Sequence, residues 1–309
     1  IVSRDNLGEI PAQTAAAALL TDYTLTVAVS VSSGVAQLVS TYPVLYNYRV
    51  LIAVVVVLFV MLVNLRGVRE SGNLFAFASY FFILSTLATL GIGLFRYFTG
   101  SLGQVVDPPE MITTLETVAA VTPFLLLHAF SSGTSAMTGI EAISNGVTAF
   151  KEPRSRNAGL TLIWMAGILA TLFLGISFLA QVIQAIPSEQ ETVISQIVRT
   201  AFSGRGIMYI LAMTSTTVIL FMAANTAFAG FPRLSAMAAS DGFLPRQLTY
   251  RGSRLVYSRG IMVLAFFASV LIVAFQASVT RLIPLYAIGV FLSFTLSQSG
   301  MARRWWKSG

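Results

Sequence analysis

Apolar runs long enough to cross a membrane recur along this 309-residue chain. The cleanest of them, Val50 to Val63, contains no polar side chain. Apolar residues make up 56% of the chain and charged residues only 10%, whereas a soluble domain carries about 25% charged residues. About 20 apolar residues in a helix cross the hydrocarbon core of a bilayer. The sequence therefore predicts an all-α integral membrane protein, built as a multi-span helical bundle.

The pattern predicts about eight spans and one short helix outside them. The fourth span is the least regular, because Gly133, Gly139 and several hydroxyl residues interrupt it, and we expect a break between about Ser131 and Thr138. A short helix is expected on the outer face within residues 188–203, with a capping-box-like start at Ser188. The rough limits of the spans are 15–39, 46–65, 73–98, 118–150, 159–186, 206–231, 259–280 and 282–300.

Lys and Arg residues indicate how the spans are oriented. If the spans alternate from a cytoplasmic start, fourteen of the nineteen basic residues lie on the inner side and five on the outer side. Loops that carry an excess of Lys and Arg stay in the cytoplasm. We therefore expect a multi-pass protein of the plasma (inner) membrane, with the start and the end of this chain both cytoplasmic. The chain begins at Ile1 and is expected to be the middle of a longer protein.

A carboxylate lies inside the first predicted span. Asp22, Thr26 and Ser30 are four residues apart, and Ser33 and Gln37 continue the same face of a helix. A charge at the bilayer centre costs at least ~2.5–3.5 kcal/mol, so such residues usually face a polar interior and are functional. A carboxylate with hydroxyls one and two turns away supplies hard oxygen ligands for an alkali cation, and it could instead carry a proton. Packing by small polar residues explains Ser33 well and Asp22 badly.

A second carboxylate, Glu141, lies in the irregular fourth span. Thr138 precedes it by three residues, and Asn145 and Thr148 continue the face. A broken helix frees backbone carbonyls that bind cations. His128 is the only histidine, and we interpret it as a packed or interfacial residue rather than a proton relay. Asn225 and Thr226 either line a pathway or pack between helices.

Other classes of protein are poorly supported. The chain has no cysteine, which excludes disulfides and thiol catalysis. No zinc-protease, nucleophile-elbow or phosphate-loop motif is present, and no potassium-channel filter. The net charge of +7 follows from basic residues at the ends of spans, so it does not indicate nucleic acid. The sequence predicts neither an enzyme nor a bound cofactor.

Three segments carry a resemblance to a known family. Residues 22–34 resemble the third transmembrane helix of KimA-type potassium uptake permeases, which belong to the amino acid–polyamine–organocation superfamily. Residues 138–146, followed by Phe150 to Pro153, resemble the sixth helix of these permeases, and residues 225–234 resemble the eighth. The first two segments are specific, whereas the third is shared with many related permeases.

The resemblance implies a fold and a set of roles. It implies the five-plus-five inverted-repeat fold in one transporter domain over residues 1–309. The spans then resemble helices three to ten, with the first repeat truncated and the second over about 118–300. It assigns cation contact to Asp22, Thr26, Ser30, Thr138 and Glu141, with Glu141 also the candidate for proton coupling.

These observations favour a secondary active transporter that takes up potassium with protons. The alternatives are an amino-acid or polyamine permease of the same superfamily, and a membrane sensor or scaffold that transports nothing. The transported species are expected to be K⁺ and H⁺. The expected partners are the lipid bilayer and a small inorganic cation or amino acid, with a homodimer left open.

Overall fold

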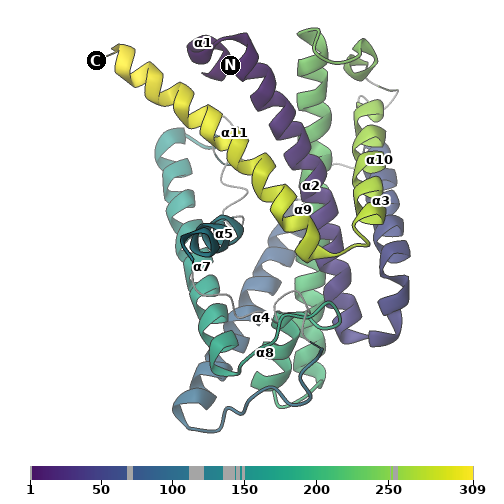
Figure 1. Ribbon diagram of the computed structural model, residues 1–309, viewed down its shortest axis with the longest axis vertical. Helices are drawn as coiled ribbons and strands as arrows, with labels where there is room; N and C mark the ends of the chain where they lie inside the picture. Colours follow the sequence, from purple (N-terminus) through teal and green to yellow (C-terminus); the bar gives the residue numbers. More distant parts are fainter. Residues whose placement is uncertain are drawn as a thin grey trace. The chain divides into compact units, whose positions relative to one another are not determined.

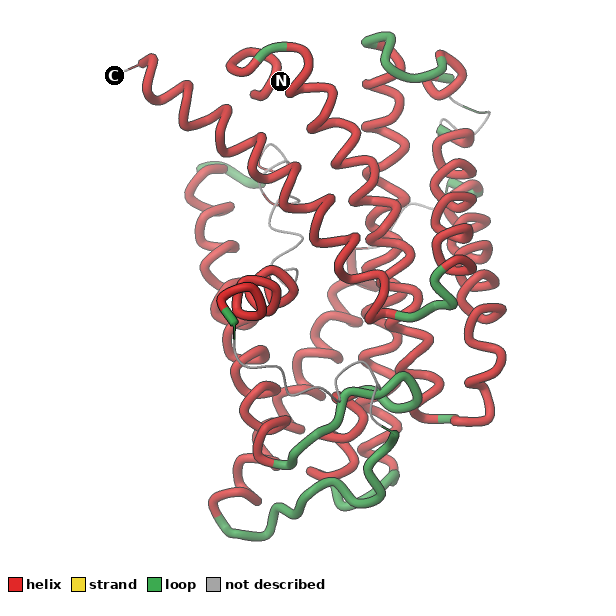
Figure 2. The backbone as a smooth tube through the Cα atoms, in the orientation of Figure 1, coloured by secondary structure: helices red, strands yellow, loops and turns green. Residues whose placement is uncertain are grey.

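The computed structural model describes residues 2–67, 72–110, 122–134, 143, 147, 150–250, 252 and 257–308. Helices make up most of this part of the chain, and it contains no strand (Figure 1 and Figure 2). The helices, in order, are α1 (Val2–Leu7), α2 (Glu9–Thr41), η1 (Pro43–Tyr48), α3 (Arg49–Leu65), α4 (Gly72–Phe98), α5 (Pro123–Thr134), α7 (Arg154–Val182), α8 (Val193–Ala201), α9 (Ile207–Ser240), η5 (Arg246–Thr249), α10 (Ser258–Ala274) and α11 (Val279–Ser308).

Six helical segments of the described chain are long and apolar enough to cross a membrane. They are α2, α4, α7, α9, α11 and the continuous segment formed by η1 and α3. Large apolar side chains point outward along α3, where Leu51, Phe59 and Leu62 are more than half exposed. Such a surface suits lipid rather than water. The prediction of an all-α, multi-span protein is confirmed.

The limits of the last two predicted spans were wrong. The span predicted over 259–280 ends at Ala274, and the next helix begins at Val279 and runs to Ser308. Gln276 and Ala277 both have positive φ angles, 55° and 52°, and so end the helix. α10 has 17 residues, which is about 25 Å at 1.5 Å per residue.

The fourth predicted span is described only in part. α5 covers Pro123–Thr134, and residues 135–142 lie outside the described part. The predicted break between Ser131 and Thr138 therefore stays a prediction. His128 is exposed on α5, with its ring centroid 6.4 Å from that of Phe124.

The short helix expected within 188–203 is present as α8, but it begins later than predicted. Its first residue is Val193, and the hydroxyl of Thr192 accepts a hydrogen bond from the backbone N–H of Ser195 at 3.2 Å. Ser188 does not cap it, because its hydroxyl accepts from the N–H of Gln190 in the preceding loop. Thr192 has the extended backbone of an ordinary N-cap.

The described chain divides into two compact units. Unit 1 consists of residues 1–35, 44–75 and 217–309, and unit 2 of residues 36–43 and 76–216. Each unit is described by itself below. The single transporter domain and the repeat boundaries expected from the resemblance stay predictions.

In unit 1, α2 and α9 pack closely through glycines. A Cβ atom on Gly230 of α9 would lie 2.6 Å from Cζ of Tyr23, and one on Gly34 of α2 would overlap the ring of Phe221. Because residue numbers rise along α2 as they fall along α9, the two helices run antiparallel. Small residues allow helices in membranes to approach in this way. α3 packs on α10, and α1 packs on α11.

In unit 2, α4 and α7 interlock through two reciprocal contacts between a glycine and a leucine. A Cβ atom on Gly93 would lie 2.6 Å from Cδ1 of Leu179, and one on Gly175 would lie 2.6 Å from Cδ1 of Leu90. Both leucines are buried in one cluster with Ile197 of α8. Residue numbers rise together along both helices, so α4 and α7 run parallel, as the alternation of spans predicts.

Candidate functional site

Asp22 lies on α2 and is 5% exposed. α2 is helical without interruption from Glu9 to Thr41, so the spacing of four residues to Thr26 and Ser30 is a helical spacing. Ser30 lies about 12 Å along the axis from Asp22, at 1.5 Å per residue. Thr26 and Ser30 are half-buried. The structure thus places a buried carboxylate and two hydroxyls along one side of a continuous helix.

Two neighbouring helices bury the part of α2 around Asp22. A Cβ atom on Gly289 of α11 would lie 3.6 Å from the backbone nitrogen of Asp22, so α11 approaches the α2 backbone itself. Gly230 of α9 faces Tyr23, the next residue along α2. One turn later, Leu25 packs with Tyr286 and Val290 of α11 in a buried cluster. Two glycines therefore bring α9 and α11 against α2 at this level.

Gly230 and Gly289 were not predicted from the sequence to belong to this region. Glycine lacks a side chain that could bind a cation, so its residue type does not indicate a cation site. The available signal was the run of small residues around Gly230, since such runs mark close helix contacts in membranes.

Thr138 and Glu141, the other two predicted site residues, lie outside the described residues. Their convergence with Asp22, Thr26 and Ser30 on one polar cavity stays a prediction. The assignment of an alkali cation to Asp22, Thr26, Ser30 and Thr138, and of a proton to Glu141, stays a prediction in the same way.

Gln37, at the far end of the polar face of α2 that begins at Asp22, has a structural partner. It belongs to unit 2, where its amide oxygen accepts a hydrogen bond from the hydroxyl of Thr192 at 2.9 Å. Ser40 accepts from the backbone N–H of Thr192 at 3.0 Å, and its carbonyl accepts from Tyr209 at 3.2 Å. These bonds join the end of α2 to the N-cap of α8 and to α9. The polar face of α2 that begins at Asp22 therefore ends in a contact between packed helices.

An amide pair between α3 and α9 was not anticipated as a pair. Asn64 donates from Nδ2 to Oδ1 of Asn225 at 2.6 Å and to its own helix at Val60 O at 2.9 Å. Both asparagines are half-buried. Of the two roles considered for Asn225, packing between helices is the one that this bond supports. Thr226 is exposed and donates to Ala223 O.

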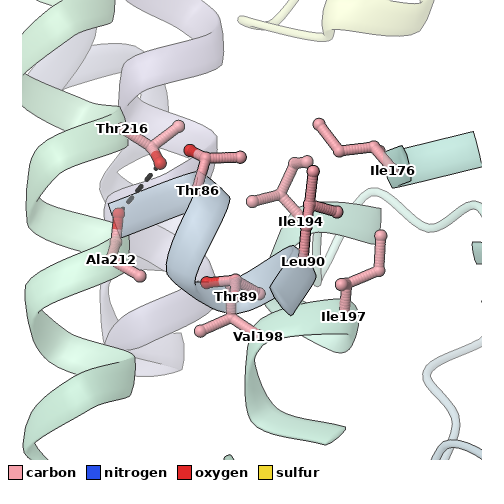
Figure 3. Close-up of a pocket in the computed structure, with 9 residues that line it drawn as sticks. All are labelled: Thr86, Thr89, Leu90, Ile176, Ile194, Ile197, Val198, Ala212 and Thr216. Carbon is pink, nitrogen blue, oxygen red and sulfur yellow. Dashed lines mark hydrogen bonds between the residues drawn. The ribbon is translucent and has the colours of Figure 1, made fainter. Parts of the chain in front are cut away.

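Unit 2 contains a small cavity of about 20 Å³ lined by residues of α4, α7, α8 and α9 (Figure 3). Thr89 donates its hydroxyl proton to Ser85 O and Thr216 to Ala212 O, both at 2.9 Å, so their lone pairs remain available. A volume of this size holds about one water molecule. It is too small for an amino acid, and none of the predicted site residues lines it. The lining residues are Thr86, Thr89, Leu90, Ile176, Ile194, Ile197, Val198, Ala212 and Thr216.

Long apolar helices and a buried carboxylate on one of them define the class: a multi-pass helical membrane protein. Comparison with known families places the chain within this class. The family model described as "Amino acid permease" matches residues 2–308, so the chain belongs to the amino acid permease family.

The chain is also similar to a named transporter. It is 48% identical over 308 residues to the potassium transporter KimA of Bacillus subtilis (strain 168). The match covers 99% of this chain and 50% of the relative, so the chain spans about half the length of that curated protein. The resemblance drawn from residues 22–34, 138–146 and 225–234 is confirmed.

Proposed function

We propose that the protein to which this chain belongs is a secondary active transporter that takes up potassium together with protons. The observation that carries the proposal is the 48% identity, along 99% of the chain, to a potassium transporter. The buried Asp22 gives it a chemical basis, because a carboxylate in an apolar bundle is stabilised by a cation. The protein acts in the plasma membrane, needs no cofactor and catalyses no covalent reaction.

In the proposed mechanism, Asp22 supplies the charge that attracts K⁺ and replaces part of its hydration shell. Thr26 and Ser30 add hydroxyl oxygens one and two turns along α2, and Thr138 adds another from the segment before Glu141. The close approach of α9 and α11 at Gly230 and Gly289 keeps lipid and bulk water away from Asp22. Charge interactions strengthen where water is excluded.

Glu141 is proposed to carry the coupled proton. A carboxyl group that gains and loses a proton during the cycle links cation movement to the proton gradient. Basic loops keep both ends of the chain in the cytoplasm. The exposed Arg154 and Arg246, which begin α7 and η5, support this orientation. The lipid bilayer surrounds the protein, and a homodimer is compatible with the proposal.

The proposal is tested with the full-length gene in a strain that cannot otherwise import potassium. Asp22→Asn is expected to abolish growth at limiting potassium and to lower initial K⁺ uptake at least tenfold, since the amide keeps the size but removes the charge. Glu141→Gln is expected to remove the dependence of uptake on the proton gradient. Thr21→Val, which changes an exposed hydroxyl on the same helix, is the matched control and should behave as wild type.

A second candidate is an amino-acid permease, because the matching family model is described in those terms. It predicts uptake of a labelled amino acid that unlabelled amino acid competes away, with little effect of Asp22→Asn. Normal growth of both acid variants at limiting potassium, together with such uptake, would replace the potassium proposal with this one. Transport of neither class of substrate would favour a sensor or scaffold.

A further inference from the structure

A second and larger cavity lies in unit 2, away from the residues assigned to transport. It has a volume of about 410 Å³. Three arginines line it: Arg96 from the end of α4, Arg199 from α8 and Arg205 from the loop before α9. Its remaining lining residues are Gly103, Gln104, Val106, Thr200, Ser203 and Gly204. None of these described lining residues is acidic, and the three arginines bring three positive charges to the lining.

Two of these arginines hold the walls of the cavity in place. Arg96 donates to the carbonyls of Thr200 and Ala201 at 3.0 and 2.9 Å, and to the hydroxyl of Ser203 at 2.5 Å. Arg199 donates to the carbonyl of Val106 and to both carboxylate oxygens of Glu191, at 2.9 and 3.2 Å. These bonds fix both guanidinium groups where they line the cavity.

Arg205 differs from the other two. Its guanidinium lies 3.6 Å from Oε1 of Glu191, beyond a hydrogen bond, and 5.8 Å from the ring centroid of Tyr209. Its side chain is 43% exposed. Arg205 makes no hydrogen bond to the described residues, so within this part of the chain its guanidinium N–H groups are not committed to a hydrogen-bond acceptor. Glu191 balances one of the three cations, which leaves two positive charges at the cavity.

The surroundings of Arg96 place the cavity at a particular depth. Phe95, Tyr97 and Phe98 occupy the same last turns of α4, and they are 68%, 42% and 80% exposed. An exposed tyrosine at the end of a membrane span, such as Tyr97, lies at the level of the lipid headgroups. The part of the cavity that Arg96 lines therefore lies at the depth of the lipid phosphates. Basic pockets between membrane helices bind such headgroups on the cytoplasmic side, and the same attraction between arginine and phosphate operates on the outer side.

We propose that this cavity binds a phosphate group, and that its depth makes this the headgroup phosphate of an anionic phospholipid. Arg205 supplies a planar fork of N–H donors that matches phosphate oxygens. Arg96 and Arg199 contribute positive charge and hold the walls. The two surplus positive charges repel K⁺, so the cavity is not part of the cation pathway.

The test uses the full-length protein in detergent and measures binding of phosphatidylglycerol by native mass spectrometry. Arg205→Gln is expected to weaken binding about tenfold, the loss of one or two charge-assisted hydrogen bonds. Arg205→Lys should be intermediate, because it keeps the charge and loses the fork. Arg281→Gln, at an exposed arginine of unit 1, is the matched control and should bind as wild type. The described contacts of Arg205 are a partly exposed ion pair and a distant contact with the Tyr209 ring, so its replacement should leave the fold intact.

Two further arms separate the source of the phosphate. Phosphatidylcholine has no net charge and is expected to bind at least tenfold more weakly than phosphatidylglycerol. Inorganic phosphate at millimolar concentration is expected not to displace the lipid. Binding of inorganic phosphate alone, dependent on Arg205 and without lipid binding, would overturn the lipid assignment. Equal binding of phosphatidylglycerol by wild type and Arg205→Gln would overturn the site.

Discussion

The carboxylate of Glu191 joins several described parts of unit 2. It is 7% exposed, accepts from the hydroxyl of Ser195 at 2.7 Å, and pairs with Arg199 and Arg205. Ser195 in turn exchanges a hydrogen bond of 2.8 Å with Tyr209. One carboxylate thus links the loop before α8, α8 itself and the start of α9.

Glu191→Gln should destabilise the protein markedly. The change leaves Arg199, whose side chain is 13% exposed, without its carboxylate. Breaking a buried pair in this way costs about 3–5 kcal/mol. The measurement is the free energy of unfolding of the full-length protein in detergent.

The matched control is Glu152→Gln. Glu152 pairs with Arg154 at 3.1 Å, but the two side chains are 74% and 50% exposed. An exposed pair contributes about 0–1 kcal/mol. Equal losses for Glu152→Gln and Glu191→Gln would show that the Glu191 network adds nothing beyond an ordinary surface pair.

From the sequence alone, site residues could be predicted where the residue type is costly in a membrane. The burial of Asp22 was predicted, because a carboxylate inside an apolar run usually faces the interior of the helical bundle rather than lipid. The partner of Gln37 was not, since helical spacing gives the direction of a side chain and not what it meets across 155 residues. The same limit applies to the bond between Asn64 and Asn225, which joins two spans far apart in the chain.

At the scale of elements, glycines determine how closely the helices approach. In unit 2 the Leu179 side chain fills the space at Gly93, and the Leu90 side chain fills that at Gly175. Leu179 is 1% exposed and Leu90 is 4% exposed, so both side chains are enclosed by the packed helices. Interiors packed this tightly respond to a single added methyl group.

Gly93→Ala should therefore destabilise the contact between α4 and α7. Overpacking of this kind costs about 1–3 kcal/mol. Gly91→Ala is the control, because nothing lies within 4 Å of a Cβ atom there and alanine favours the helix. The measurement is the unfolding midpoint of the full-length protein in detergent. Combining Gly93→Ala with Leu179→Ala should destabilise the protein by less than the sum of the two single changes. Strictly additive losses of stability would contradict a direct contact between Gly93 and Leu179.

The ends of elements were harder to predict than their existence. The spans over 46–65 and 73–98 match Arg49–Leu65 and Gly72–Phe98 closely, because long apolar runs leave little choice. The start of α8 was misplaced, since both Ser188 and Thr192 are suitable caps by sequence. Thr192 is used because it also bonds to Gln37 and Ser40, two tertiary contacts that local sequence does not contain.

At the scale of the whole molecule, orientation in the membrane is the property most open to direct test. This chain has no cysteine. In a full-length protein from which any other cysteines have been removed, a single introduced thiol therefore reports on one position. Glu110→Cys is expected to react with an impermeant maleimide added outside intact cells, and Gln247→Cys is not. Both side chains are exposed. Reaction of Gln247→Cys from outside would reverse the orientation inferred from the basic loops.

The parallel arrangement of α4 and α7 has a consequence for gene architecture. Because the two helices point the same way, Phe98 at the end of one and Arg154 at the start of the other lie at opposite ends of the pair. In a deletion variant that joins residue 98 directly to residue 154, α7 would therefore cross the membrane in the inverted orientation. Every later helix would be inverted in the same way, and the arginines beyond Arg233 would be carried to the opposite side of the membrane. Such a deletion would invert the membrane orientation of every helix that follows it.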